Sequence, residues 1–198
     1  MPAVVCGLLA LGMTASSYGQ PLLVSDHHES LSVGEKAEVL AKRTFSPNSF
    51  IKSAVTAGIN QWQNQPPEWG QGMSGYGHRY GLKLANRGIE NGIGFLGAVT
   101  LHQDPRYFYS GETGAWRRVK HALVYTFMTR TDSGGLTFST WRFAGNYGSQ
   151  FISNTWRPPR DAQVGDALFR GTVSIGYDAA SNIFKEFWPD IRKRVLRR

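Results

Sequence analysis

The sequence predicts an all-α protein, a single bundle of about five to six helices that pack through seams of small residues. In several segments small residues recur every three or four positions, and polar and apolar residues separate onto opposite sides at helical spacing. The 23 glycines lie inside these patterned segments and form no low-complexity tract. With 198 residues, 41% of them hydrophobic, the chain suffices for one domain with its own core.

The first 31 residues are expected to lie outside the bundle. Residues 3–13 form an apolar run followed by small and polar residues, so we expect a signal peptide over residues 1–19. An uncleaved anchor is the alternative, although the run is shorter than the roughly 20 residues that span a membrane. Cys6 would leave with the signal, which would exclude disulfide and thiolate chemistry. The polar residues 20–31 are expected to be a disordered leader.

The helical domain is predicted over residues 32–190. Ser32 and Glu35 have the spacing of a capping box and begin a short helix that ends near residue 43. Pro47 suits the first position of the next helix, which the prolines at 66 and 67 end. A long helix is expected from about residue 72 to residue 99.

This long helix has small residues along one side. At about 100° per residue they fall in one arc, and the charged residues from Arg79 to Glu90 lie opposite. Another helix could approach such a seam closely, so we expect it to be packed and not exposed. Its members are Gly77, Gly81, Ala85, Gly88 and Gly92, and Gly145, Gly148 and Gly176 are expected to act similarly in two later helices.

Three more helices are expected, over residues 115–129, 138–156 and 165–187, the last two with clear separation of polar and apolar sides. Residues 131–135 form a turn between the first two. The flanking segments 124–131 and 136–143 could instead pair as a β-hairpin, which is the alternative to helix there.

The C-terminal residues 191–198 are predicted to be a basic tail on a chain of net charge +8. Such a tail is expected to contact anionic lipid or another polyanion, with a solvated terminus as the alternative. No nucleic-acid-binding module is recognisable, so no nucleic-acid partner is expected. The basic residues of the tail are Arg192, Lys193, Arg194, Arg197 and Arg198.

The candidate residues for catalysis lie in two loops. His102 and Asp104 lie close together in the connector before residue 114, and Glu68 is another acid in a loop; together they are the candidate site of a hydrolase-type enzyme. A turn with a local ion pair between Asp104 and Arg106 explains the connector more simply. Residues 26–29, Asp-His-His-Glu, have metal-binding side chains but no framework, so we expect neither a metal site nor a cofactor.

Four strings resemble those of a group of exported bacterial proteins with signal peptides and small-residue-rich helices. They are Pro-Glu-Trp-Gly-Gln-Gly (67–72), His-Gln-Asp-Pro-Arg-Tyr-Phe (102–108), Arg-Thr-Asp-Ser-Gly (130–134) and Lys-Glu-Phe-Trp-Pro-Asp-Ile (185–191). The resemblance covers residues 34–191 and implies export and one continuous domain, but no functional residue.

These observations together favour a non-enzymatic, exported helical protein of the bacterial cell envelope, in the periplasm or associated with a membrane. We expect it to pack or oligomerise through its glycine seams, with itself or with another envelope protein. An exported hydrolase is the alternative.

Overall fold

The structure is a computed structural model that describes residues 29–196, with side chains described up to residue 193. Within these residues it is mostly helical, as predicted: six α-helices pack together, with one antiparallel hairpin, β1 (Met128–Arg130) and β2 (Leu136–Phe138), between α4 and α5. The predicted signal peptide lies outside the described residues. The helices are α1 (Val33–Phe45), α2 (Pro47–Trp62), α3 (Met73–Thr100), α4 (Ala115–Phe127), α5 (Thr140–Ser153) and α6 (Val164–Leu196).

The first two helices begin where the sequence predicts. The Glu35 amide donates to the Ser32 hydroxyl at 3.3 Å, and the Ser32 amide donates to the Glu35 carboxylate at 2.8 Å, so the capping box is complete. Ser46 caps α2 by accepting from the Ser49 amide at 3.2 Å, with Pro47 at the first helical position.

The hairpin corrects one predicted helix end. The helix from residue 115 stops at Phe127, and Thr129 pairs with Thr137 in the hairpin that was the alternative for this stretch. The physical reason is a contact distant in sequence: the Asp104 amide donates to the Arg130 carbonyl at 2.8 Å, and the Thr129 hydroxyl donates to the Asp104 carbonyl at 2.6 Å. The connector thus holds β1 in an extended conformation.

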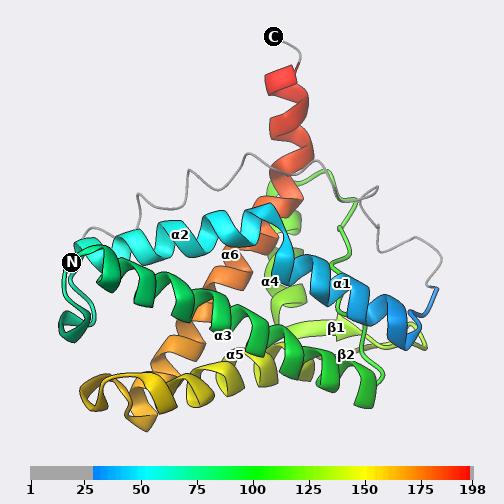
Figure 1. The fold of residues 1–198 in the computed structure, drawn as a ribbon. Coiled ribbons are helices and arrows are strands. Elements are labelled where there is room, and N and C mark those ends of the chain that lie inside the picture. Colours follow the sequence, from blue (N-terminus) through cyan, green and yellow to red (C-terminus); the bar gives the residue numbers. More distant parts are fainter. Residues whose placement is uncertain (1–28, 197–198) are drawn as a thin grey trace.

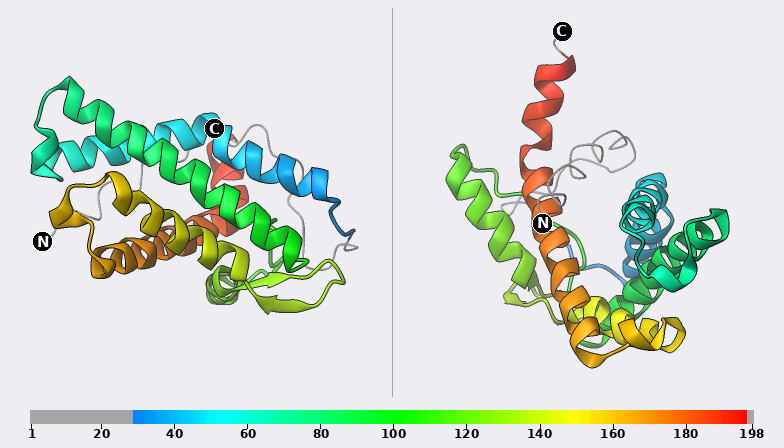
Figure 2. Two further views of the ribbon diagram at one scale, coloured as in Figure 1. Left: turned by 60° about the horizontal axis from the view of Figure 1, so that its bottom comes forward. Right: turned by 90° about the vertical axis from the view of Figure 1, so that its left-hand side faces the viewer.

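Helix α5 lies between two groups of helices. It packs against α3, which α1 and α2 cover, and against α6, which α4 covers. Seen from the side, the two groups diverge from α5 (Figure 2). The last turns of α6 project beyond the other helices (Figure 1). Among the described helices, none is both long enough and apolar enough to cross a membrane.

The contact between α3 and α5 is very close. A Cβ atom at Gly145 would lie 2.5 Å from the Glu90 carbonyl oxygen, and one at Gly148 would lie 2.8 Å from Ile93 Cδ1. From the other side, a Cβ at Gly97 would lie 3.0 Å from the Trp141 Cα. Gly145 and Gly148 therefore allow α5 to approach α3, as small residues do at helix contacts.

The predicted seam of α3, in contrast, does not pack within the chain, so the expectation that it would not be exposed is wrong. Its five residues Gly77, Gly81, Ala85, Gly88 and Gly92 are all exposed. A Cβ at any of its four glycines, or at Gly176 in α6, would have no neighbour within 4 Å. The other side of α3 faces inward instead, and it includes the buried polar residues Arg79 and Asn86. The carbonyl oxygens of Gln65, Pro66 and Gly70 accept hydrogen bonds from Arg79, and these tertiary partners override the sequence pattern.

The two kinds of glycine give opposite predictions. Gly145→Ala should lower the free energy of unfolding by about 1–3 kcal/mol, because the new methyl group meets backbone and α3 and α5 must separate. Gly88→Ala, in open space within a helix, should raise it by about 0.5–1 kcal/mol. Urea unfolding of both variants measures this. Equal effects would contradict the orientation of α3.

Candidate functional site: a cationic pocket

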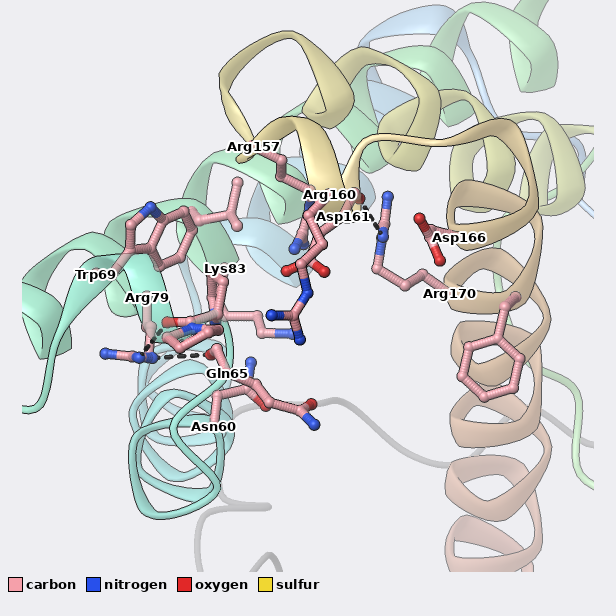
Figure 3. A pocket seen from close by; sticks show the side chains of 14 residues that line it. Asn60, Gln65, Trp69, Arg79, Lys83, Arg157, Arg160, Asp161, Asp166 and Arg170 are labelled. Atoms are coloured by element: carbon pink, nitrogen blue, oxygen red, sulfur yellow. Dashed lines mark hydrogen bonds between the residues drawn. The ribbon is translucent and has the colours of Figure 1, made fainter.

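A pocket of about 290 Å³ opens between the end of α2, the 3₁₀ turn η2 (Pro67–Trp69), α3 and the start of α6 with its preceding 3₁₀ turn η4 (Pro159–Asp161). Figure 3 shows the side chains that line it. Cationic residues predominate among them. The described lining includes five cationic residues, Arg79, Lys83, Arg157, Arg160 and Arg170, and two carboxylates, Asp161 and Asp166.

Arg79 forms one wall of this pocket, which we call the cationic pocket. Its guanidinium is almost fully buried and donates to the carbonyl oxygens of Gln65 at 2.8 Å, Pro66 at 2.7 Å and Gly70 at 2.7 Å. It also donates to the Gln61 side chain. All of these acceptors are neutral, so Arg79 fixes the loop before α3, and no carboxylate among the described residues pairs with its positive charge.

Arg157 and Arg170 form the opposite wall. Arg170 donates to the Asp161 carbonyl at 2.9 Å and to the Asn154 side chain, but its Nε is buried without a hydrogen-bond partner among the described residues. Burial, and then the neighbouring charge of Arg170, lower the pKa of Arg157 to about 10. Both guanidinium groups therefore lie in a place that disfavours further positive charge.

Lys83 and Arg160 extend into the same space from α3 and η4 (Figure 3). Within the described part of the chain, neither side chain has a hydrogen-bond or ion-pair partner. Burial lowers the pKa of Lys83 to about 8, and the charges of Arg157 and Arg170 act in the same direction. An anion in the pocket would relieve this repulsion and accept charge-assisted hydrogen bonds.

A second group of charges lies where α1, α3, α5 and α6 meet, and we call it the central charged cluster. Arg43 lies 3.3 Å from the Asp178 carboxylate and 3.9 Å from that of Glu90. Arg87 lies 3.7 Å from Glu90, and Arg142 lies 3.9 Å from Asp178. These ion pairs connect the two groups of helices through side chains that are largely buried.

The two carboxyl groups of the central charged cluster differ. Burial raises the pKa of Glu90. Burial also acts to raise the pKa of Asp178, but the charges of Arg43 and Arg142 and a hydrogen bond from Asn146 outweigh it and hold the pKa below its usual value. Asp178 is thus the carboxylate that neutralises the arginines most strongly.

The hydrolase candidates do not form one site. His102 is 80% exposed beside Asp132, at 3.6 Å, while Asp104 is fully buried and bound by Arg106 at 2.7 Å. Glu68 lies before α3 and His102 after it, and a 28-residue helix is about 42 Å long. The structure therefore supports the simpler explanation of the connector, a turn with a local ion pair.

Glu186 is a buried acid that the sequence analysis missed. Its carboxylate accepts hydrogen bonds from the Tyr107 hydroxyl at 2.8 Å and from the Ser110 amide and hydroxyl, each at 3.0 Å. His121 Nδ1 lies 3.1 Å away, and Arg118 lies 3.7 Å away. Burial acts to raise the pKa of Glu186, but these hydrogen bonds outweigh it and lower the pKa to about 2. Glu186, in α6, thus holds Tyr107 and Ser110 of the connector and His121 of α4 next to α6.

The predicted basic tail begins as helix. α6 continues to Leu196, and Arg192 and Lys193 are exposed on it. The side chain of Arg194, and Arg197 and Arg198 altogether, lie outside the described residues. The cationic pocket was likewise missed by the sequence analysis, although the charges on both sides of Pro158 and Pro159 could have drawn attention to it.

Glu186→Gln should lower the free energy of unfolding by about 2 kcal/mol at pH 7, because charge-assisted hydrogen bonds from Tyr107 and Ser110 are lost. Since the folded pKa lies below the usual value, this stabilisation is complete above about pH 4.5 and is lost toward pH 2. Urea unfolding of the variant and the wild type across that range tests this. Glu112→Gln, at an exposed pair, is the control, and an equal loss there would contradict the role of Glu186.

No family model, no curated protein and no solved structure matches the chain. The resemblance to exported bacterial proteins therefore stays a prediction. Among the described residues, the cationic pocket is the feature with the clearest chemistry.

Proposed function

We propose that this chain is a non-enzymatic, exported helical protein of the bacterial cell envelope that binds an anionic ligand in the cationic pocket. The observation that carries the proposal is the excess of positive charge, five cationic residues against two carboxylates among the described residues that line the pocket. Such an excess in a confined space attracts anions.

The pocket is preformed for this role. Arg79 and Arg170 are held by neutral oxygen atoms, so their positions do not depend on a carboxylate partner. Arginine and lysine bind anions differently: the guanidinium groups of Arg157 and Arg160 offer planar pairs of donors to carboxylate or phosphate oxygens, and Lys83 offers a point charge. Little rearrangement would be needed on binding, which favours affinity.

Export and membrane association rest on other features. The apolar run at residues 3–13 supports a signal peptide, and with it a place in the periplasm or envelope. The projecting end of α6 carries exposed Arg192 and Lys193, and this supports contact with anionic lipid. The hydrolase alternative has no comparable support, since its three residues lie apart.

Self-association is a second candidate function. The exposed stripe of α3 is flat, because its members Gly77, Gly81, Ala85, Gly88 and Gly92 have no larger side chains. A second copy or another envelope protein could lay a helix along it.

Anion binding should depend on charge at Lys83. Sulfate, whose charge is constant over the range, should bind the wild type at pH 7 and about tenfold more weakly at pH 9, because Lys83 loses its proton near pH 8. Lys83→Gln should bind weakly at both values, and Lys83→Arg should retain binding at pH 9. Isothermal titration measures this. Absence of sulfate binding by the folded wild type would refute the proposal.

If α3 mediates self-association, Gly81→Leu should shift an oligomer toward monomer without loss of thermal stability, because its side chain points into open space. Sedimentation velocity measures the shift. Gly34→Leu is the matched control, at an exposed helical glycine outside the stripe. A wild type that stays monomeric at high concentration, or an equal effect of both variants, would reject this candidate.

A further inference from the structure

Positive charges continue along α3 beyond the cationic pocket. Arg79, Lys83 and Arg87 follow each other at four-residue intervals on the inward side of α3, so each lies about 6 Å along the helix from the last. Arg79 and Lys83 line the pocket, and Arg87 lies at the Glu90 carboxylate of the central charged cluster. One side of α3 thus joins the two groups of charges.

The charges continue from α3 to the neighbouring helices. Lys52 lies in α2, which packs against α3. Burial, and then the charges of Arg87 and Arg43, lower its pKa. In the described part of the chain, the Lys52 side chain has no hydrogen-bond or ion-pair partner. Arg43 in turn reaches Asp178 in α6.

Lys185 continues the series on α6, two turns after Asp178 and therefore on the same side of that helix. Its side chain reaches solvent, yet the surrounding protein is dense enough that burial lowers its pKa to about 7, with Arg43 acting in the same direction. Its ammonium group lies 3.4 Å from the Asn182 side-chain oxygen and 5.2 Å from the centre of the Tyr107 ring. It has no carboxylate within ion-pair distance among the described residues.

We define the cationic row as Arg160, Lys83, Arg87, Lys52, Arg43 and Lys185. We propose that the cationic row is one continuous binding surface for a linear acidic polysaccharide, whose carboxylates repeat along a chain of sugar rings. This rests on the proposed anion-binding function of the pocket and extends it from a single anionic group to a chain.

Two observations favour a polysaccharide. Glu90 and Asp178 neutralise part of the charge on Arg43 and Arg87. The cations of the row without an ion pair among the described residues come from four different elements and suit repeated single charges; they are Arg160, Lys83, Lys52 and Lys185. Trp69 and Phe169 line the pocket end, and Phe169 is 71% exposed. Their rings offer apolar faces on which sugar rings can pack beside the cations.

The experiment compares galacturonate, an oligogalacturonate and a single-stranded oligodeoxynucleotide of similar charge, by isothermal titration of the full chain at pH 6. The oligogalacturonate should bind at least about tenfold more tightly than the monomer, because several groups engage together. The double variant Lys52→Gln with Lys185→Gln should abolish this gain and leave sulfate binding in the pocket unchanged.

The controls separate charge from folding and from the pocket. Lys120→Gln, on an exposed part of α4, should change nothing, and arginine at positions 52 and 185 should restore the gain. If sulfate binds but the oligomer gains nothing, or the double variant keeps the gain, the cationic row is refuted while the pocket stands. Tighter binding of the oligodeoxynucleotide would overturn the polysaccharide in favour of nucleic acid. If sulfate itself does not bind, the proposed function fails.

Discussion

The orientation of α3 is the constraint on which the rest of the structure depends. Its charged side faces the other helices, and buried charges are tolerated only where opposite charges or hydrogen-bonding groups meet them. Arg79 therefore donates hydrogen bonds to the carbonyl oxygens of the loop before α3, and Glu90 forms ion pairs with Arg43 and Arg87. The contacts that the charged side of α3 makes thereby position α1, the loop that precedes α3 and the wall of the pocket.

The close approach of α5 makes this orientation possible. Gly145 lies against the Glu90 carbonyl, and Trp141 lies against Gly94 and Gly97, so α3 and α5 meet almost backbone to backbone. A compact contact at one end of α5 places Arg142 within reach of Asp178 in α6. The apolar core is correspondingly small around Trp141, with Leu40, Ala98 and Phe95. Polar contacts determine how the helices are oriented, whereas the small residues allow α3 and α5 to lie close together.

In such an interior, the proposed anion binding and the stability of the fold make opposite demands. Among the described residues, Lys83 and Lys185 have no carboxylate within ion-pair distance. The pKa of each is lowered, because burial disfavours its charged form in the folded chain. An anionic ligand would stabilise the charged form of these lysines, because it supplies the missing negative charge, and this would favour binding to the folded chain. The proposed anion binding therefore depends on which side of α3 faces inward, because that side carries Arg79 and Lys83.

The sequence by itself determined the helices and where several of them begin. Capping at Ser32 and Ser46 and the periodicity of α5 and α6 depend on residues close in the chain, so local rules suffice for them. It did not determine which side of α3 is buried, because that depends on acceptors such as the Gln65 and Pro66 carbonyls, which lie in another segment. For the same reason, the cationic pocket and the partners of Glu186 were decided only by tertiary structure, whereas the predicted helix over residues 72–99 already separates Glu68 from His102. Periodicity shows which side of a helix is polar. Only the fold decides whether hydrogen-bond or ion-pair partners lie next to those polar groups.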